Sequence, residues 1–288
     1  MKPLLITTDF SENSKPAVHY GYELARYIKA NVILCNAIII PAEIPNAGFV
    51  VWPTDEYNTL MKNSSHELKE LKKELERTLT NSSFKPQITC ANESGAVCSV
   101  IAHETEKHQA EIIIIGEHGN AGIGQFLIGN HARNLIDSAT KPLLIVPPTA
   151  RFAVIKRIAL ALDFNTPDQD MNAVTDLIPF AKMLDAEILL THIYNDHHFC
   201  TSTQQYLNTI MERLAQNNSY SKIDTLLVKD TTIEDGLNWF CKYGHIDVLA
   251  MVHRPKRFFA SLFNESHTKN MAAHLCVPLF VFPFKSKI

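Results

Sequence analysis

A cluster of glycines carries the strongest chemical signal in this chain of 288 residues. Five of the ten glycines fall between positions 116 and 129, and these are Gly116, Gly119, Gly122, Gly124 and Gly129. They follow the apolar run 112–115 and precede a helical pattern that begins at Asn130. A glycine loop between a strand and a helix lets backbone N–H groups approach a phosphate, and the helix N-terminus adds a positive dipole end. The spacing matches neither GxxxxGK[ST] nor GxGxxG, and a flexible connection is the alternative interpretation.

Asp9 and Asp163 each directly follow an apolar run, 4–8 and 158–162. Asp9 directly follows residues 4–8, where its carboxylate could accept a hydrogen bond from a ligand or could cap the next turn. Beside the glycines, Glu117 and His118 are the candidates for a general base, although the sequence orients neither side chain. The chain holds no GxSxG motif, and its spacing assembles no Ser/His/Asp or Cys/His set. We therefore assign no catalytic residue.

Imidazole and thiol groups gather in the C-terminal part of the chain. The candidates are His192, His197, His198, Cys200 and His253. Such groups suit Zn²⁺, and we expect any bound metal there, but the spacing matches no template. Histidines of a surface loop are the favoured interpretation, so no metal ligand is assigned. His103 and His108 are one position too far apart for a zinc-peptidase helix, and we interpret the segment 103–108 as a solvated helix end.

The composition indicates an ordinary globular chain. It is 46% hydrophobic and 20% charged, which excludes a highly charged disordered protein. The 27 Lys and Arg residues against 30 Asp and Glu residues argue against binding to nucleic acid. The apolar run at the N-terminus is too short for a signal-peptide core, and no stretch approaches the roughly 18 apolar residues of a membrane span. The six cysteines form no CxxC motif and favour a reduced compartment. We expect a cytoplasmic protein.

The chain repeats itself with a shift of 136 residues. This shift carries the apolar run 112–115 onto 248–251 and the run 142–146 onto 278–282, and it places Asn134 on Asn270. Pro147 and Pro148, which cannot continue a strand or a helix, mark the join. We predict two copies of one domain, residues 1–149 and 150–288.

Within a copy, short apolar runs alternate with longer helical patterns. Helices are predicted at 14–28, 60–79, 95–108 and 130–139, and the long segment 38–57 is interpreted as a lid or a packing arm. The runs are apolar throughout, as strands buried on both faces of a parallel sheet are. We predict an α/β fold of two doubly wound domains, flavodoxin-like or Rossmann-like, each with a five-stranded parallel sheet flanked by helices. Ligands of such sheets bind beyond the carboxyl ends of the strands.

The glycine spacing also carries a family resemblance. Gly116-x2-Gly119-x9-Gly129 resembles the nucleotide-binding signature of the universal stress protein family, G-x2-G-x9-G-(S/T). The opening Asp9-x-Ser11-x2-Ser14-x2-Ala17 is similar to the first strand–helix turn of that family. The runs 141–146 and 277–281 are similar to its last strand. The resemblance covers nearly the whole chain as a tandem pair.

This resemblance implies a ligand and a set of contacts. The ligand would be ATP or a related adenine nucleotide, with Mg²⁺ as a candidate companion ion. Asp9 would contact the adenine-ribose part, while Thr7 and Ala37 would line the base. The residues around the ribose and phosphates would be Gly116, Gly119, Gly129 and Asn130. Because Asn130 stands where the family has Ser or Thr, we expect weakened rather than abolished binding.

The second copy lacks the glycines. Under the shift of 136, Val252, Pro255 and Glu265 replace Gly116, Gly119 and Gly129, although Asp163 persists. We expect no nucleotide in the C-terminal domain. The last strands, 143–146 and 279–282, are apolar and need covering, so we expect the two domains to pair through them as an intrachain pseudo-dimer. A homodimer of the whole chain stays open.

Three functions fit these observations. The leading hypothesis is a tandem universal stress protein, a cytoplasmic regulatory or binding protein of the stress response that binds adenine nucleotide in its N-terminal domain. The second is a slow ATP hydrolase or self-phosphorylating protein. The third is an interaction scaffold without a ligand. We favour a protein that is not an enzyme.

Overall fold

The computed structural model describes most of the chain. The described residues are 2–39, 54–77, 84–117, 130–162, 167–194, 201–217, 220–230, 233–252 and 277–283. The first half contains β1 (Leu4–Thr7), α1 (Lys15–Tyr27), β2 (Val32–Ile38), α2 (Thr54–Arg77), β3 (Ile88–Ser94), α3 (Val97–Lys107), β4 (Ile112–Gly116), α4 (Asn130–Ser138) and β5 (Leu143–Val146). The second half contains β6 (Arg157–Ala161), α5 (Pro167–Leu184), β7 (Glu187–Tyr194), α6 (Thr201–Asn217), β8 (Ile223–Lys229), α7 (Ile233–Tyr243), β9 (Val248–Val252) and β10 (Leu279–Phe282).

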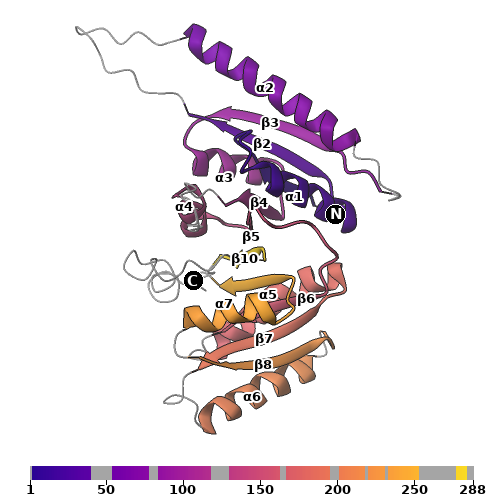
Figure 1. The fold of residues 1–288 in the computed structure, drawn as a ribbon, viewed down its shortest axis with the longest axis vertical. Helices are drawn as coiled ribbons and strands as arrows, with labels where there is room; N and C mark the ends of the chain where they lie inside the picture. The colour runs from indigo at the N-terminus through magenta and orange to yellow at the C-terminus, as the bar shows by residue number, and fades with distance from the viewer. Residues whose placement is uncertain are drawn as a thin grey trace, which may run out of the picture.

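The strands form one ten-stranded sheet in the order β3-β2-β1-β4-β5-β10-β9-β6-β7-β8. Neighbouring strands within each half are parallel, and β5 and β10 join the halves as an antiparallel pair. Figure 1 follows this order from β3 near the top to β8 near the bottom. Counted outward from the junction, the two halves have equivalent strand orders, β5-β4-β1-β2-β3 and β10-β9-β6-β7-β8. The doubly wound α/β fold class is confirmed.

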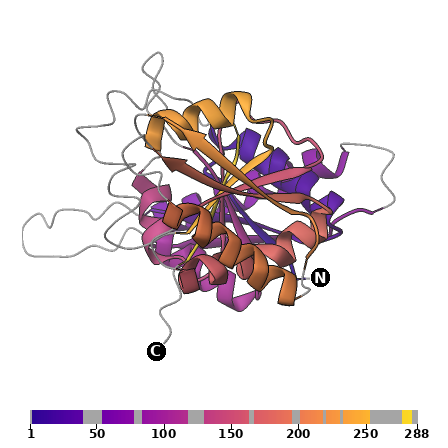
Figure 2. The same ribbon diagram turned by 90° about the horizontal axis from the view of Figure 1, so that it is seen from below.

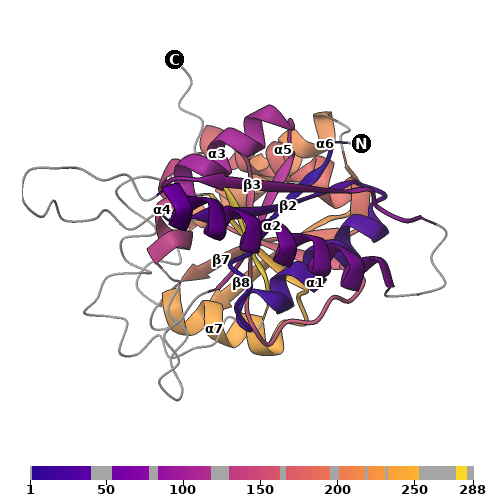
Figure 3. The same cartoon turned by 90° about the horizontal axis from the view of Figure 1, so that it is seen from above.

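Helices cover both faces of the sheet (Figures 2 and 3). Apolar side chains of α1, α2, α5 and α6 pack on one face, and those of α3, α4 and α7 pack on the other. The position of β4 between the two layers explains why its sequence is apolar throughout. Ile112 and Ile114 face the first layer, whereas Ile113 and Ile115 face the second. Both faces of the strand are buried, as expected for a parallel strand between two helical layers.

The predicted helices exist, with corrected bounds. α1 and α3 lie within their expected segments, and Ser14 is the N-cap residue of α1. α2 begins at Thr54, so interpreting residues 54–57 as part of a loop was wrong. Glu56 lies in the first turn, where a negative charge complements the helix dipole and helps the helix to start early. The rest of the predicted lid, residues 40–53, lies outside the described residues.

The join between the halves is packed on both sides. In the β5–β10 pair, Leu144 lies opposite Phe280, whose ring stacks on Phe180 with centroids 4.4 Å apart. The connecting segment 147–156 runs beside α1, where Phe152 meets Tyr20 edge-on at a centroid distance of 5.3 Å. Ile155 of this segment is buried. The segment is therefore part of the packed structure.

Within the described ranges, no helix has both the length and the apolar character needed to span a bilayer.

Candidate functional site

The strand order of the first half contains a topological switch point, the place where a doubly wound sheet can form a ligand-binding crevice. From β1 the chain moves outward to β2 and β3, and it then returns to β4 on the other side of β1. Open α/β sheets bind ligands at this kind of topological switch point, beyond the carboxyl ends of the strands. Ile6 of β1 pairs with Ile114 of β4, so the residues that follow each strand emerge at one edge of the sheet. Thr7 and Asp9 therefore come to the same edge as Gly116.

The end of β1 is held by hydrogen bonds. The buried Thr7 hydroxyl donates to the Ile114 carbonyl oxygen, 3.2 Å away. The Asn36 amide donates to the Thr8 carbonyl oxygen at 2.7 Å, and the Thr8 hydroxyl accepts a hydrogen bond from the Phe10 N–H at 3.0 Å. The Thr7 hydroxyl is thus engaged between β1 and β4. These bonds fix the direction in which the chain leaves β1.

Asp9 is exposed and caps the turn that follows. Its Oδ1 accepts hydrogen bonds from the Ser11 N–H at 3.0 Å and from the Ser11 hydroxyl at 2.6 Å. Between them, Phe10 has a φ of 63°, in the left-handed region. The turn-capping interpretation of Asp9 is therefore confirmed. The cap also fixes the carboxylate at the edge of the sheet, where it could meet a ligand.

Gly116 allows α1 to approach β4. A Cβ at this position would lie 3.2 Å from the Asn13 carbonyl oxygen and 3.3 Å from the Ala17 Cβ. Both distances are shorter than an ordinary van der Waals contact. From the sequence we favour ligand approach for Gly116 over a merely flexible connection, and the structure gives this glycine a packing role as well. The N-terminal turn of α1 sits over the end of β4.

Glu117, one of the two general-base candidates named from the sequence, is buried at this edge. It is only 2% exposed, and its N–H donates to the Val146 carbonyl oxygen at 3.1 Å. Within the described part of the chain, its Oε2 is buried and accepts no hydrogen bond. Burial raises the pKa of the carboxyl group to about 7. A carboxyl group with such a pKa can give or take a proton near neutral pH.

A hollow of about 850 Å³ lies next to this edge. It is lined by the turn between β3 and α3 and by α4, through Ile39, Ser94, Gly95, Ala96, Val97, Cys98, His131, Asn134 and Ser138. Its volume is within the range of small-molecule sites. Thr7, Asp9 and Gly116 are not among its described lining residues, and Ala37 lies half-buried in β2 against the neighbouring helical layer. No motif marks Ser94 or Asn134, so only the fold reveals them.

The other predicted residues are placed as follows. Gly119 and Gly129 lie outside the described residues, as do His197, His198, Cys200 and His253. α4 begins at Asn130, whose side chain is not described. His192 Nδ1 lies 2.9 Å from the Leu162 carbonyl oxygen, with which it shares a hydrogen bond. Glu104 is buried, so interpreting the whole segment 103–108 as solvated was wrong: one face of α3 turns inward.

The fold and this edge define a doubly wound α/β protein with its candidate site at the topological switch point of the first half. The model of the Universal stress protein family matches residues 1–147, and the chain belongs to this family. Universal stress protein MJ0577 of Methanocaldococcus jannaschii is 25% identical over 159 residues, which cover 50% of this chain and 94% of that protein. Universal stress protein MJ0531 of the same organism is 28% identical over 147 residues, covering 50% of this chain and 81% of that protein.

The fold similarity extends over both halves. The crystal structure of a universal stress protein from Archaeoglobus fulgidus matches with a TM-score of 0.67 at 14% identity, covering 99% of this chain and 97% of that one. A protein of unknown function, PA1789 of Pseudomonas aeruginosa, matches with a TM-score of 0.58 at 10% identity, covering 98% and 92%. At these identities the likeness concerns the fold.

Proposed function

We propose that this member of the universal stress protein family is a regulatory binding protein of the cytoplasm that takes ATP or a related adenine nucleotide in its first half. The observation that supports this most is the β1–β4 pairing, which brings the Asp9 turn and Gly116 to one switch point. From Gly116 the glycine-rich segment leads to α4, which begins at Asn130. A phosphate group is stabilised where glycine N–H groups and a helix N-terminus converge.

The proposal gives each residue a role that its environment permits. The capped Asp9 carboxylate accepts hydrogen bonds from the adenine-ribose part, and Thr7 and Ala37 line the base. Gly116, Gly119, Gly129 and Asn130 surround the ribose and phosphates. The hydrogen-bonding capacity left at Glu117 Oε2 fits a polar ligand at this edge. Mg²⁺ as a companion of the phosphates belongs to the same proposal, because carboxyl and phosphate oxygens are its usual ligands.

The second half is proposed to bind no nucleotide. Val252 ends β9 at the place where Gly116 ends β4, and its partly buried side chain packs on the core. We propose further that residues 1–149 and 150–288 are two domains related as a pseudo-dimer through the β5–β10 pair. Expressed separately, each domain would expose an apolar edge strand and would self-associate.

Slow ATP hydrolysis is the second candidate function. It is favoured by Glu117, whose pKa of about 7 is suited to a general base beside the glycine-rich segment. Timed release of phosphate from ATP separates the two functions. A hydrolase would lose its activity in the Glu117→Gln variant while still binding ATP, whereas a binding protein would release no phosphate in either form.

The test of nucleotide binding begins with the protein as purified. Adenine nucleotide that copurifies is detected by the absorbance ratio and identified by mass spectrometry. Calorimetric titration with ATP is then repeated with Gly129→Glu, which copies Glu265 of the second half, and with Val252→Gly as the matched control. We expect Gly129→Glu to abolish binding and Val252→Gly to leave it unchanged. Wild-type affinity in Gly129→Glu would refute the site.

A further inference from the structure

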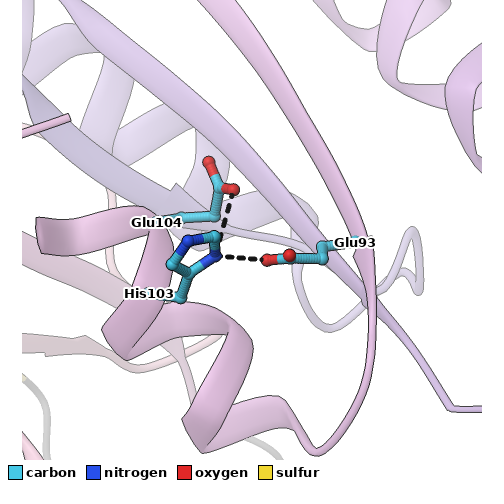
Figure 4. Close-up of side chains that lie close together, drawn as sticks. All are labelled: Glu93, His103 and Glu104. Atoms are coloured by element: carbon cyan, nitrogen blue, oxygen red, sulfur yellow. Dashed lines mark hydrogen bonds and ion pairs between the residues drawn. The ribbon is translucent and has the colours of Figure 1, made fainter. Parts of the chain in front are cut away.

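Three side chains of the kinds that bind metals converge between the end of β3 and α3. Glu93 comes from β3, and His103 and Glu104 come from α3; their ligand atoms all lie within 4.8 Å of one another. His103 Nδ1 is 2.8 Å from Glu93 Oε2 and 3.8 Å from Glu104 Oε1. Figure 4 shows the imidazole with both carboxylates directed towards it.

The local fold holds this group together. Gly95 joins β3 to α3 with a φ of +152°, a conformation that other residues rarely adopt, and α3 folds back along the sheet. Glu93 lies next to the end of β3, and His103 lies in the helix that returns past it. Since a strand and a helix supply the ligands, the backbone positions are set by elements rather than by a loop.

Glu104 is the buried member of the group, and basic side chains lie beside both of its carboxylate oxygens. Its side chain is 2% exposed, and Oε1 receives a hydrogen bond from Lys107 Nζ at 2.7 Å. Among the described residues, Oε2 accepts no hydrogen bond, although His108 Nε2 lies 3.1 Å away in an ion-pair position. A buried carboxylate oxygen without a hydrogen bond is costly unless a charged partner meets it. His108 is such a partner when protonated, so the buried Glu104 carboxylate lies where the structure favours positive charge.

We propose that Glu93, His103 and Glu104 bind one divalent transition-metal ion of the Zn²⁺ class. One imidazole nitrogen and two carboxylate oxygens are a common ligand set for Zn²⁺, with water in the fourth place. Ligand bonds of about 2.1 Å in a tetrahedron put neighbouring ligand atoms about 3.4 Å apart. The separations of 2.8 and 3.8 Å from His103 Nδ1 bracket that value, so small side-chain rotations would bring the three ligand atoms to one ion. The site lies in the first half, whereas the sequence led us to expect any metal in the second.

Lys107 sets the strength of this site. Its ammonium group occupies Glu104 Oε1, so the metal must displace it or bind through Oε2. A cation that competes for the same carboxylate weakens metal binding without removing a ligand. Replacing Lys107 with an uncharged side chain of similar length should therefore tighten the site. A merely structural ion-pair cluster would show no such gain.

The experiment is a titration of the tag-free full-length chain with Zn²⁺, read by a competing chromophoric chelator and by elemental analysis. We expect one Zn²⁺ per chain. Glu93→Gln and His103→Gln should each weaken binding by about tenfold or more, as loss of even an outer-shell partner costs 10–100-fold. Lys107→Met should strengthen it several-fold. The melting temperature of the wild type should rise with Zn²⁺, and that of Glu93→Gln should rise less.

The matched control is His19→Gln. His19 Nε2 lies 3.3 Å from Glu74 Oε1, an exposed imidazole–carboxylate pair that belongs to no described group of three ligands. Its loss should leave Zn²⁺ affinity unchanged. Glu93 and His103 are partly solvent-accessible, so their variants should fold, and circular dichroism checks this. Absence of stoichiometric Zn²⁺, or equal affinity in Glu93→Gln and wild type, would overturn the proposal. Loss of Zn²⁺ in a His197→Ala/His198→Ala variant would do the same.

Discussion

The ends of β4 and β9 occupy equivalent places and are built differently. β4 lies between β1 and β5, and β9 lies between β6 and β10. Leu4 pairs with Ile112 in the first half, and Ile158 pairs with Val248 in the second. β4 nevertheless ends in a glycine under the first turn of α1, whereas β9 ends in a valine that packs on the core. At equivalent places, the glycine of β4 lets the first turn of α1 come close to the strand, whereas β9 carries a valine side chain there. A shared fold therefore does not imply a shared site.

The largest expected effect concerns the β5–β10 pair. Phe280 is fully buried, stacks on Phe180 and meets Phe282 edge-on, whereas its cross-strand partner Leu144 is a smaller, aliphatic buried side chain. Phe280→Ala should lower the free energy of unfolding by about 3–5 kcal/mol. Leu144→Ala should cost less, because a buried aromatic pair adds about 0.5–1.5 kcal/mol. Urea titrations of both variants measure the difference, and a larger loss in Leu144→Ala would contradict it.

The exchange of Gly116 and Val252 tests the comparison directly. In Gly116→Val the new side chain meets the Asn13 carbonyl oxygen and Ala17, so stability should fall by about 1–3 kcal/mol and nucleotide binding should be lost. Val252→Gly removes a partly buried side chain and should cost about 1–2 kcal/mol, with nucleotide binding unchanged. Calorimetric titration with ATP and denaturant unfolding separate the two effects. Normal ATP binding by Gly116→Val would move the site elsewhere.

Glu117 should make the stability of the first half depend on pH. Its pKa in the folded protein, about 7, lies above the ordinary 4.5, so between these values the folded state binds more protons than the unfolded state. The stability that this group contributes is therefore present at low pH and is lost as pH rises through 7. Glu117→Gln stays neutral and should be more stable than the wild type by about 1–3 kcal/mol at pH 8.

At pH 4.5 and below, that difference should shrink towards zero. Urea midpoints at several pH values provide the measurement, and parallel profiles for the two proteins would exclude a buried ionising Glu117. Under the shift of 136 the second half carries His253 at this place, so a carboxyl effect belongs to the first half.

The smallest effect on stability is expected for Asp9. Its two hydrogen bonds to Ser11 are exposed, so Asp9→Ala should cost only about 0.5–1 kcal/mol. The proposed contact with the adenine-ribose part predicts a fall in ATP affinity of about tenfold, the loss of one hydrogen bond to a charged group. Asp163→Ala, the equivalent change in the second half, should leave ATP affinity unchanged. Equal affinity in both variants and the wild type would reduce Asp9 to its turn-capping role.

The fold was predictable because its signals are local. Continuous apolar runs such as 112–115 identify buried parallel strands, and the shift of 136 identifies the repeat. The close contact of Gly116 with α1 was not predictable, because it joins residues about a hundred positions apart. Glu117 and Glu104 look like surface residues in the sequence, and only the packing of helices on the sheet buries them. The acid directly after a buried strand was the one signal that pointed to Glu117.

The connecting segment 147–156 determines whether β5 pairs with β10 of its own chain or with β10 of a second chain. Phe152 lies against Tyr20 and Tyr27 of α1, and the buried Ile155 leads directly into β6. A segment anchored at Phe152 and Ile155 keeps the second half close to the first, so the effective concentration of β10 at β5 exceeds that of β10 from a second molecule. Exchange of β6–β10 between two chains is thereby suppressed. Shortening the segment, or removing the Phe152 anchor, would turn the same antiparallel pair into the junction of a domain-swapped dimer.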